Sequence, residues 1–203
     1  IEDLKKYNIN IAYVTPSHQF PTGVIMGISR RTELLNWANE NPNRYIVEDD
    51  YDSEFKYTGR PIPALKATDV NDKVIYLGSF SKSISPAIRV SYLVLPKALL
   101  NIYQKKLPYF ICPVPTLNQK ILYKFIKDGY FVKHINKMRT LYKKKREYLV
   151  NTIKINSSKI LDKEISIQGA DAGLHLVIKL NEKINEKAFL KECLENSLQL
   201  YSC

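Results

Sequence analysis

Short apolar runs alternate with helical patterns along most of the chain. Residues 10–14, 45–47, 74–77 and 90–95 each form a largely apolar run of strand length, and residues 29–39 carry apolar side chains at helical spacing. A strand with one solvent-exposed face alternates apolar and polar side chains. Continuous apolar runs are therefore typical of strands that are buried on both faces. The pattern predicts an α/β sheet with helices on both faces.

A second helical pattern covers residues 121–149, and Gly129 is expected to divide it into two helices. Residues 165–167 and 174–180 are expected as strands around a turn at 169–173, followed by a helix over 186–196. This last part reads as a small α+β appendage. Because the chain begins just before an interior strand and stops as another extended segment starts, we expect a fragment of a larger protein.

Composition narrows the class of protein. The chain has 203 residues, 45% of them hydrophobic, which suits one domain of ordinary size or a large domain with a small appendage. No apolar run approaches the roughly 20 residues that cross a bilayer, so we expect no membrane association. The 3 cysteines are far apart and form no CxxC pair, so we predict neither a disulfide framework nor a zinc site, and a cytoplasmic location.

The net charge of +11 comes mostly from residues 120–163. The run Lys143-Lys144-Lys145-Arg146 lies there and could attract phosphate or an acidic protein surface. We favour a solvated helix face, since no nucleic-acid motif accompanies the run. The alternative, nucleic-acid binding, predicts a steep salt dependence of affinity for DNA.

Candidate chemistry gathers where two predicted strands end. Alternation places Asp49 and Tyr51 on one face of the strand and Glu48 and Asp50 on the other. Ligands of open parallel sheets bind beyond the carboxyl ends of the strands, and the segment 79–82 also lies at such an end. A carboxylate, a phenol, hydroxyls, a lysine and a nearby arginine are the components of a pyridoxal phosphate pocket.

Each group has a chemical reason to be there. Lys82 forms an imine only as a neutral amine, so its pKa must fall from about 10.4. Asp49 would keep the pyridine nitrogen protonated, which makes the ring an electron sink. Arg89 offers paired donors to phosphate, and Ser79 adds a hydroxyl. Other interpretations stay open at this point: Lys82 as an ordinary surface residue, and the acidic row as a helix cap or a Mg²⁺ site formed by Glu48, Asp49, Asp50 and Asp52.

Four segments resemble the aminotransferase-like domain of the MocR subfamily of GntR transcription regulators, most closely its γ-aminobutyrate-responsive type. These segments are residues 14–23 (VTPSHQFPTG), 48–55 (EDDYDSEF), 78–82 (GSFSK) and 129–139. The resemblance implies the type I fold of pyridoxal-phosphate-dependent aminotransferases. Residues 1–132 would be the second part of the cofactor-binding large domain, and residues 133–203 a linking helix with a truncated small C-terminal domain.

The resemblance also implies the cofactor pyridoxal 5′-phosphate and a role for each matching residue. Lys82 falls on the family's imine lysine, Asp49 on the partner of the ring nitrogen, and Tyr51 on the phenol near the ring oxygen. Ser79 and Arg89 fall on phosphate ligands, and Ser81 is a secondary candidate for the same role.

One position departs from ordinary aminotransferases. Phe20 precedes Pro21-Thr22-Gly23 where those enzymes usually have an asparagine that contacts the cofactor. MocR proteins resemble this sequence there, so the departure favours the regulator branch.

The resemblance implies a domain that senses a small amino compound or amino acid and forms a homodimer in the complete protein. DNA would be bound only by a winged-helix domain outside residues 1–203. The alternative is an active aminotransferase in which Lys82 also moves a proton. Other residues are expected to be structural: Trp37 in the core, and His18, His134 and His175, which lie in unrelated segments, as satisfied structural histidines.

Overall fold

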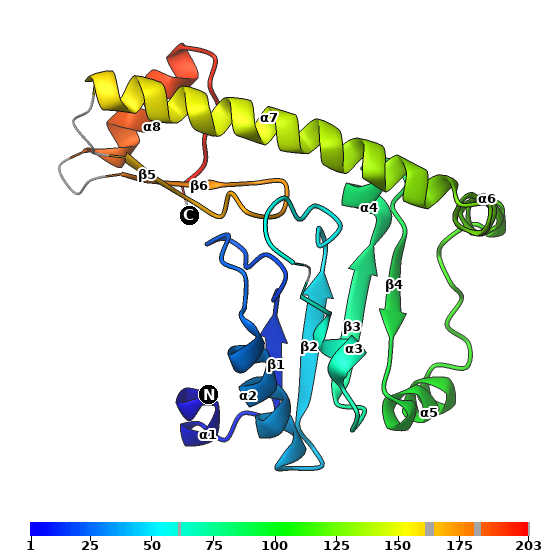
Figure 1. Cartoon of the computed structure of the whole chain (residues 1–203). Helices are drawn as coiled ribbons and strands as arrows, with labels where there is room; N and C mark the ends of the chain where they lie inside the picture. Colours follow the sequence, from blue (N-terminus) through cyan, green and yellow to red (C-terminus); the bar gives the residue numbers. More distant parts are fainter. Residues whose placement is uncertain (61, 161–164, 181–183, 203) are drawn as a thin grey trace.

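The computed structural model describes residues 1–60, 62–160, 165–180 and 184–202 (Figure 1). A sheet stands beneath a long helix that crosses above the carboxyl ends of its first three strands. The elements follow one another as α1 (Glu2–Lys6), β1 (Ile11–Val14), α2 (Ile28–Asn39), β2 (Tyr45–Asp50), α3 (Leu65–Thr68), β3 (Val74–Ser79), α4 (Phe80–Ser83), β4 (Ser91–Val94), α5 (Lys97–Lys106), α6 (Thr116–Lys127), α7 (Tyr130–Ile160), β5 (Ile165–Gln168), β6 (Val177–Leu180) and α8 (Glu186–Glu195).

The main sheet is mainly parallel, as the sequence predicts. Its strand order is β1-β2-β3-β4, with β1, β2 and β3 parallel and β4 antiparallel to β3. A parallel return needs a crossover of a dozen or more residues, usually a full helix. The link from β3 to β4 contains only the four-residue helix α4, so β4 returns antiparallel.

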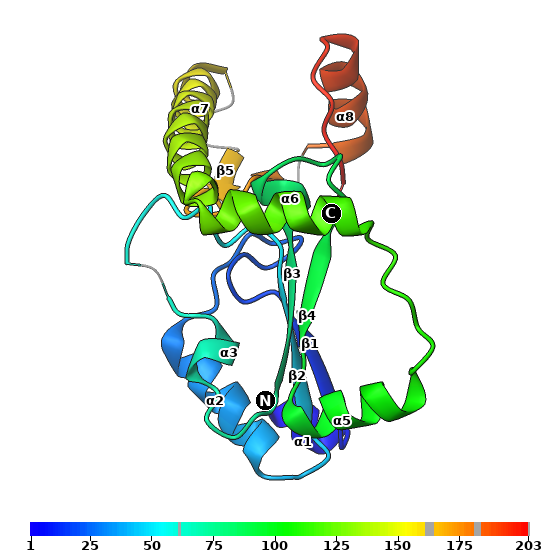
Figure 2. The ribbon, with the colours of Figure 1, turned by 90° about the vertical axis from the view of Figure 1, so that its right-hand side faces the viewer.

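One face of this sheet carries the hydrophobic core. Helices α2 and α3 lie on that side (Figure 2). The core residues are buried completely or nearly so: Ala12, Leu34, Trp37, Ala38, Ile46, Leu65 and Val74. Trp37 therefore packs in the core, as predicted.

The other face is less covered than the apolar runs predict. Ile11 and Tyr13 of β1 are each 61% exposed, while Ala12 between them is buried. Apolar side chains point to both faces of the strands, but within the described residues only the α2 side is packed into a core cluster. Within the described residues, β1 is therefore packed into a core on one face.

Strand β2 alternates strictly between a buried and a half-buried face. On the buried face, Glu48 is fully covered and its carboxylate accepts hydrogen bonds from the backbone N–H groups of Leu65 (2.8 Å) and Lys66 (2.9 Å) at the start of α3. Burial raises the pKa of the Glu48 carboxyl. The two amides have no partner inside the helix, so Glu48 holds α3 against the sheet.

The later part of the chain matches its predicted layout. Gly129, with φ of +78°, separates α6 from α7. Strands β5 and β6 pair antiparallel and precede α8. The boundary between residues 132 and 133 falls in the first turn of α7, and its role as a domain boundary stays a prediction. None of the described helices is both long and apolar enough to span a membrane.

Replacing Glu48 with alanine is expected to lower the free energy of unfolding by about 2–4 kcal/mol, because two buried backbone donors lose their acceptor. Chemical denaturation of Glu48→Ala beside Glu33→Ala measures this. Glu33 is an exposed partner of Arg30, so its variant should change stability by less than about 1 kcal/mol. Equal effects from both variants would contradict the structural role of Glu48.

Candidate functional site

The carboxyl edge of the main sheet gathers the predicted site residues. Asp49 lies near the end of β2 and pairs in register with Leu77 of β3. Ser79 is two residues after Leu77, so it shares a sheet face with Asp49. Ser81 and Lys82 follow immediately in α4. Groups far apart in the sequence therefore meet at one edge.

Arg89 reaches the same edge because β4 runs antiparallel. Ser91 at the start of β4 pairs with Ser79 at the end of β3, and Arg89 comes just before it. Its backbone φ is +50°, in the left-handed region that non-glycine residues rarely adopt. Such a conformation costs of order 1 kcal/mol or more and is held by its surroundings.

Two cations at this edge have free side chains. Lys82 and Arg89 are exposed, and neither side chain has a hydrogen-bond or ion-pair partner among the residues that the structure describes. Burial lowers the pKa of the His175 imidazole, and the positive charge of Lys82 adds to this shift. An amine and a guanidinium are thus available to bind a ligand.

The Asp49 carboxylate has one partner that the sequence analysis missed. The Tyr13 hydroxyl, on the neighbouring strand β1, donates a hydrogen bond to Asp49 Oδ2. This bond raises the pKa of Tyr13 to about 12. Tyr13 pairs in register with Val47, two residues before Asp49, so this register and strand alternation together place both side chains on one face.

Tyr51 has a defined hydrogen-bonding state. Its hydroxyl donates to the backbone carbonyl of His18 over 2.7 Å. Burial, together with the nearby carboxylates of Asp52, Asp49 and Asp50, raises the pKa of Tyr51. The phenol is therefore neutral, and while its proton is held by His18 its oxygen can accept a hydrogen bond.

Ser79 caps the short helix α4. Its Oγ accepts a hydrogen bond from the backbone N–H of Ser81 over 3.2 Å. Since the oxygen acts as an acceptor here, the hydroxyl proton of Ser79 remains available to a ligand. Ser81 takes part in this contact through its backbone N–H. Phosphate binding by the Ser81 side chain stays a prediction.

The acidic row does not converge on a single Mg²⁺ site. Glu48 binds the start of α3, and Asp50 accepts hydrogen bonds from the hydroxyls of Ser53 (2.8 Å) and Tyr76 (2.7 Å). Asp52 instead lies beside His18, at 3.0 Å. Among the described residues, the group whose ligand atoms lie close enough to hold a metal is His18, Asp52 and His175.

His134 and Phe20 both contact residues near the carboxyl edge of the sheet. His134 on α7 places Nε2 at 3.1 Å from the backbone carbonyl of Ser83, beside Lys82. Phe20 packs edge-on against His175, with ring centroids 5.8 Å apart.

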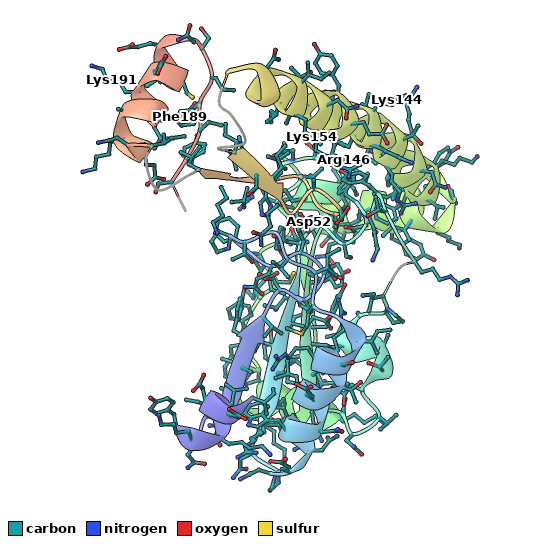
Figure 3. The ribbon with its side chains drawn as sticks, turned by 60° about the vertical axis from the view of Figure 1, so that its left-hand side comes forward. Asp52, Lys144, Arg146, Lys154, Phe189 and Lys191 are labelled. Atoms are coloured by element: carbon teal, nitrogen blue, oxygen red, sulfur yellow. The ribbon has the colours of Figure 1, made fainter. Side chains whose placement is uncertain are left out.

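The basic run on α7 is only partly a solvated face. Lys144 is exposed on the outer side of the helix, whereas Arg146 points toward the body of the protein (Figure 3). Arg146 lies 3.7 Å from the Asp171 carboxylate and 5.8 Å from the Tyr57 ring. It therefore fastens α7 to the loops above the sheet.

Comparisons with known proteins identify the family of the chain. The family described as aminotransferase class I and II matches residues 2–201. The chain is 40% identical over 201 residues to the HTH-type transcriptional regulator YdeL of Bacillus subtilis, covering 99% of this chain and 42% of that protein. It is 33% identical over 187 residues to the probable rhizopine catabolism regulatory protein MocR of Rhizobium meliloti, covering 92% of this chain and 37% of that protein.

A solved structure with a similar fold contains a cofactor derivative. It is the alpha-aminoadipate aminotransferase of Thermus thermophilus, complexed with N-(5′-phosphopyridoxyl)-L-leucine. The TM-score is 0.79 and the identity 26%, over 98% of this chain and 51% of that chain. The chain thus spans about half or less of the length of the proteins it matches.

Removing the Asp49 carboxylate is expected to return the pKa of Tyr13 from about 12 toward about 10. At about pH 11 the variant Asp49→Ala should therefore contain close to one phenolate more than the wild type, measured by ultraviolet absorbance. The double variant Tyr13→Phe/Asp49→Ala should show no such gain. A gain that persists without Tyr13 would assign it to another tyrosine.

Proposed function

Because the chain belongs to the aminotransferase class I and II family, we propose that it is the effector-sensing domain of a bacterial GntR/MocR-type transcription regulator. Its relatives across almost the whole chain, YdeL and MocR, are regulators. The predicted MocR resemblance is confirmed at this level, and the γ-aminobutyrate-responsive type stays a prediction. DNA would be bound by another part of the complete protein.

The fold is the type I fold of pyridoxal-phosphate aminotransferases, with a mainly parallel sheet and helices. Family membership implies pyridoxal 5′-phosphate as the cofactor. The residues present fit this group. The unpaired Lys82 amine and Arg89 guanidinium lie at the same sheet edge as the Asp49 carboxylate and the Ser79 hydroxyl. This meeting of four groups is the observation that carries the proposal.

When bound, the cofactor supplies an aldehyde that reacts with amines and a ring that accepts electrons. Lys82 would hold it covalently through its neutral amine, and Asp49 would keep a proton on the ring nitrogen. Tyr13 would orient the Asp49 carboxylate through its hydrogen bond. Arg89 and Ser79 would bind the phosphate. The Tyr51 oxygen, with its proton held by His18, would accept a hydrogen bond from the ring hydroxyl.

Sensing requires that an amino compound favour one of two conformations of the domain. A small amine or amino acid would compete with Lys82 for the cofactor aldehyde and release the lysine side chain. The released Lys82 ammonium would then add a positive charge in α4, one residue before Ser83, whose carbonyl contacts His134 of α7. We propose a homodimer for the complete protein and a cytoplasmic location, as the family resemblance implies.

The active aminotransferase remains the alternative to a sensor. Its signature is repeated turnover of an amino acid with a keto acid acceptor by the complete protein. The regulator relatives favour the sensor, for which we expect binding without sustained turnover.

Borohydride reduction tests the cofactor assignment. The full-length protein with added pyridoxal phosphate should show a visible absorbance band, and reduction should fix the cofactor covalently to the peptide that contains Lys82, detected by mass spectrometry. Lys82→Ala should lose this adduct. Lys179→Ala is the matched control because Lys179 is exposed on β6, away from this edge. An adduct located on another lysine would overturn the assignment.

Neighbouring carboxylates provide a second test. Asp49→Asn should weaken pyridoxal phosphate binding by at least tenfold while leaving stability nearly unchanged, because Asp49 lies on the half-buried face. Asp50→Asn should lower stability, since Asp50 is buried and bonded to Ser53 and Tyr76, yet retain cofactor affinity in the folded protein. Absorbance titration and denaturation measure the two quantities. Equal losses of affinity would show that the strand register does not select Asp49.

A further inference from the structure

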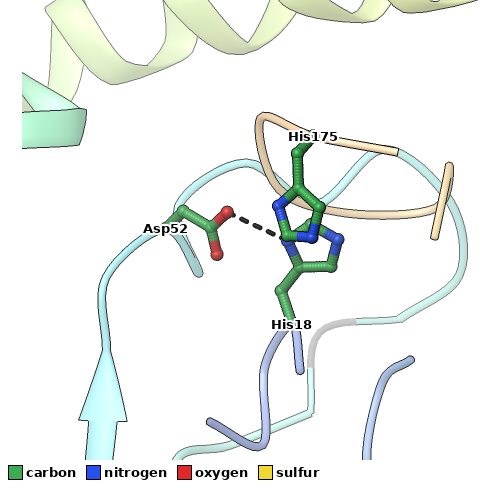
Figure 4. A group of neighbouring side chains, drawn as sticks. All are labelled: His18, Asp52 and His175. Carbon is green, nitrogen blue, oxygen red and sulfur yellow. Dashed lines mark hydrogen bonds and ion pairs between the residues drawn. The ribbon is translucent and has the colours of Figure 1, made fainter. Parts of the chain in front are cut away.

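Three side chains from distant segments meet above the carboxyl edge of the sheet. His18 follows β1, Asp52 follows β2, and His175 precedes β6; we call them the His18 cluster (Figure 4). The side chains of His18 and Asp52 are 0% and 2% exposed. The rings of His18 and His175 lie 4.0 Å apart. The cluster is thus a buried polar contact between the sheet and the segment that leads into β6.

The side chain of His18 has an oxygen at each ring nitrogen. Nδ1 lies 3.0 Å from Asp52 Oδ2, and Nε2 lies 3.3 Å from the backbone carbonyl of Gly169. The same Asp52 oxygen accepts a hydrogen bond from the backbone N–H of Leu174 over 3.2 Å. Residues 169–174 are therefore held to the sheet through His18 and Asp52 together.

The main chain of His18 faces the proposed cofactor pocket. Its carbonyl accepts the proton of the Tyr51 hydroxyl, the group proposed to contact the cofactor ring. A single residue thus contacts the pocket phenol through its backbone and the C-terminal segment through its side chain.

The packing around His18 leaves little room for independent movement. A Cβ added at Gly173 would lie 1.8 Å from His18 Nδ1, and one added at Gly23 would lie 2.5 Å from Gly169 Cα. Backbone bonds continue the contact, from Gly173 N–H to the Phe55 carbonyl (2.7 Å). Close packing of this kind transmits a displacement rather than absorbing it.

The cluster also contains unsatisfied atoms. Asp52 Oδ1 and His175 Nε2 are buried, and neither atom has a hydrogen-bond partner within the part of the chain that the structure describes. Buried polar groups of a purely structural contact are usually paired. Burial, the charge of His18 and the charge of Lys82 lower the pKa of His175, so His175 is neutral near pH 7.

We propose that His18 is a positioning residue that couples the Tyr51 phenol in the cofactor pocket to the C-terminal unit, residues 165–180. This inference rests on the proposed function. A ligand that changes the hydrogen bond of Tyr51 shifts the backbone of His18 and thereby the contacts of Gly169 and Leu174. By linkage, docking of the C-terminal unit strengthens cofactor binding by the same factor that cofactor binding strengthens docking.

The test combines two measurements on the full-length protein. Visible absorbance titration gives the affinity for pyridoxal phosphate, and hydrogen exchange gives the protection of residues 165–180 with and without the cofactor. In the wild type we expect the cofactor to raise this protection about tenfold. His18→Asn keeps an amide donor for Asp52 but has no group at the Nε2 position. It should lower cofactor affinity about tenfold and abolish the cofactor-dependent gain in protection.

Two further variants distinguish coupling through His18 from a general loss of contacts in the same interface. Thr58→Val removes the 2.8 Å bond from the Thr58 hydroxyl to Asp171 in the same interface without touching Tyr51. It should reduce protection in both states and leave the cofactor-dependent gain intact. Tyr51→Phe should abolish that gain as His18→Asn does, with no additional loss in the double variant.

The outcomes separate the two proposals. A wild-type gain that survives in His18→Asn would overturn the coupling while the adduct at Lys82 still supports the proposed function. Absence of that adduct in the wild type would remove the proposed function itself. One set of samples contains EDTA, and a parallel set contains zinc and no EDTA. Protection of residues 165–180 that depends on zinc and is lost in His18→Asn would assign the cluster to a metal and also overturn the coupling.

Discussion

The parallel pairing of β2 with β1 on one side and β3 on the other is the constraint on which the site depends. Parallel strands end at a common edge, so residues from three separate segments meet there. Alternation along β2 then divides its acidic residues between two tasks. Glu48 and Asp50 point toward the core side, where Glu48 binds the start of α3 and Asp50 binds Ser53 and Tyr76. Asp49 points to the opposite face, where it binds Tyr13 and is available to a ligand.

Local properties of the chain predict much of this arrangement. Strand periodicity alone separates Asp49 from Asp50, and the structure has that alternation. The end of α6 at Gly129 follows from the freedom of glycine to adopt positive φ, and the helical spacing on either side predicts α6 and α7. Parallel strands end at a common edge, and ligands bind beyond their carboxyl ends. This rule predicts that Ser79 and Lys82 lie near Asp49, without knowledge of any side-chain contact.

The contacts that complete the site depend on tertiary neighbours and were not predictable from pattern. Tyr13 and Asp49 are 36 residues apart, and the bond between them requires the register of β1 on β2. Glu48 is bonded to backbone amides 17 and 18 residues away, which gives no sequence signal. His18 meets Gly169 across 151 residues. The burial of His18 agrees with a structural histidine. Its side-chain contact with Gly169 and its backbone contact with Tyr51 depend on the tertiary structure and could not be predicted from the sequence.

Helix α7 is long enough that a small tilt displaces its ends by several ångströms. Its 31 residues make a rod of about 45 Å, and a tilt of about 5° at one end would displace the other by about 4 Å. One end rests, through His134, on the carbonyl of Ser83 next to Lys82, and the other extends toward β5 and α8 (Figure 1). Because Arg146 holds the middle of α7, a tilt about that contact moves the end beside Lys82 and the end near β5 by similar distances in opposite directions.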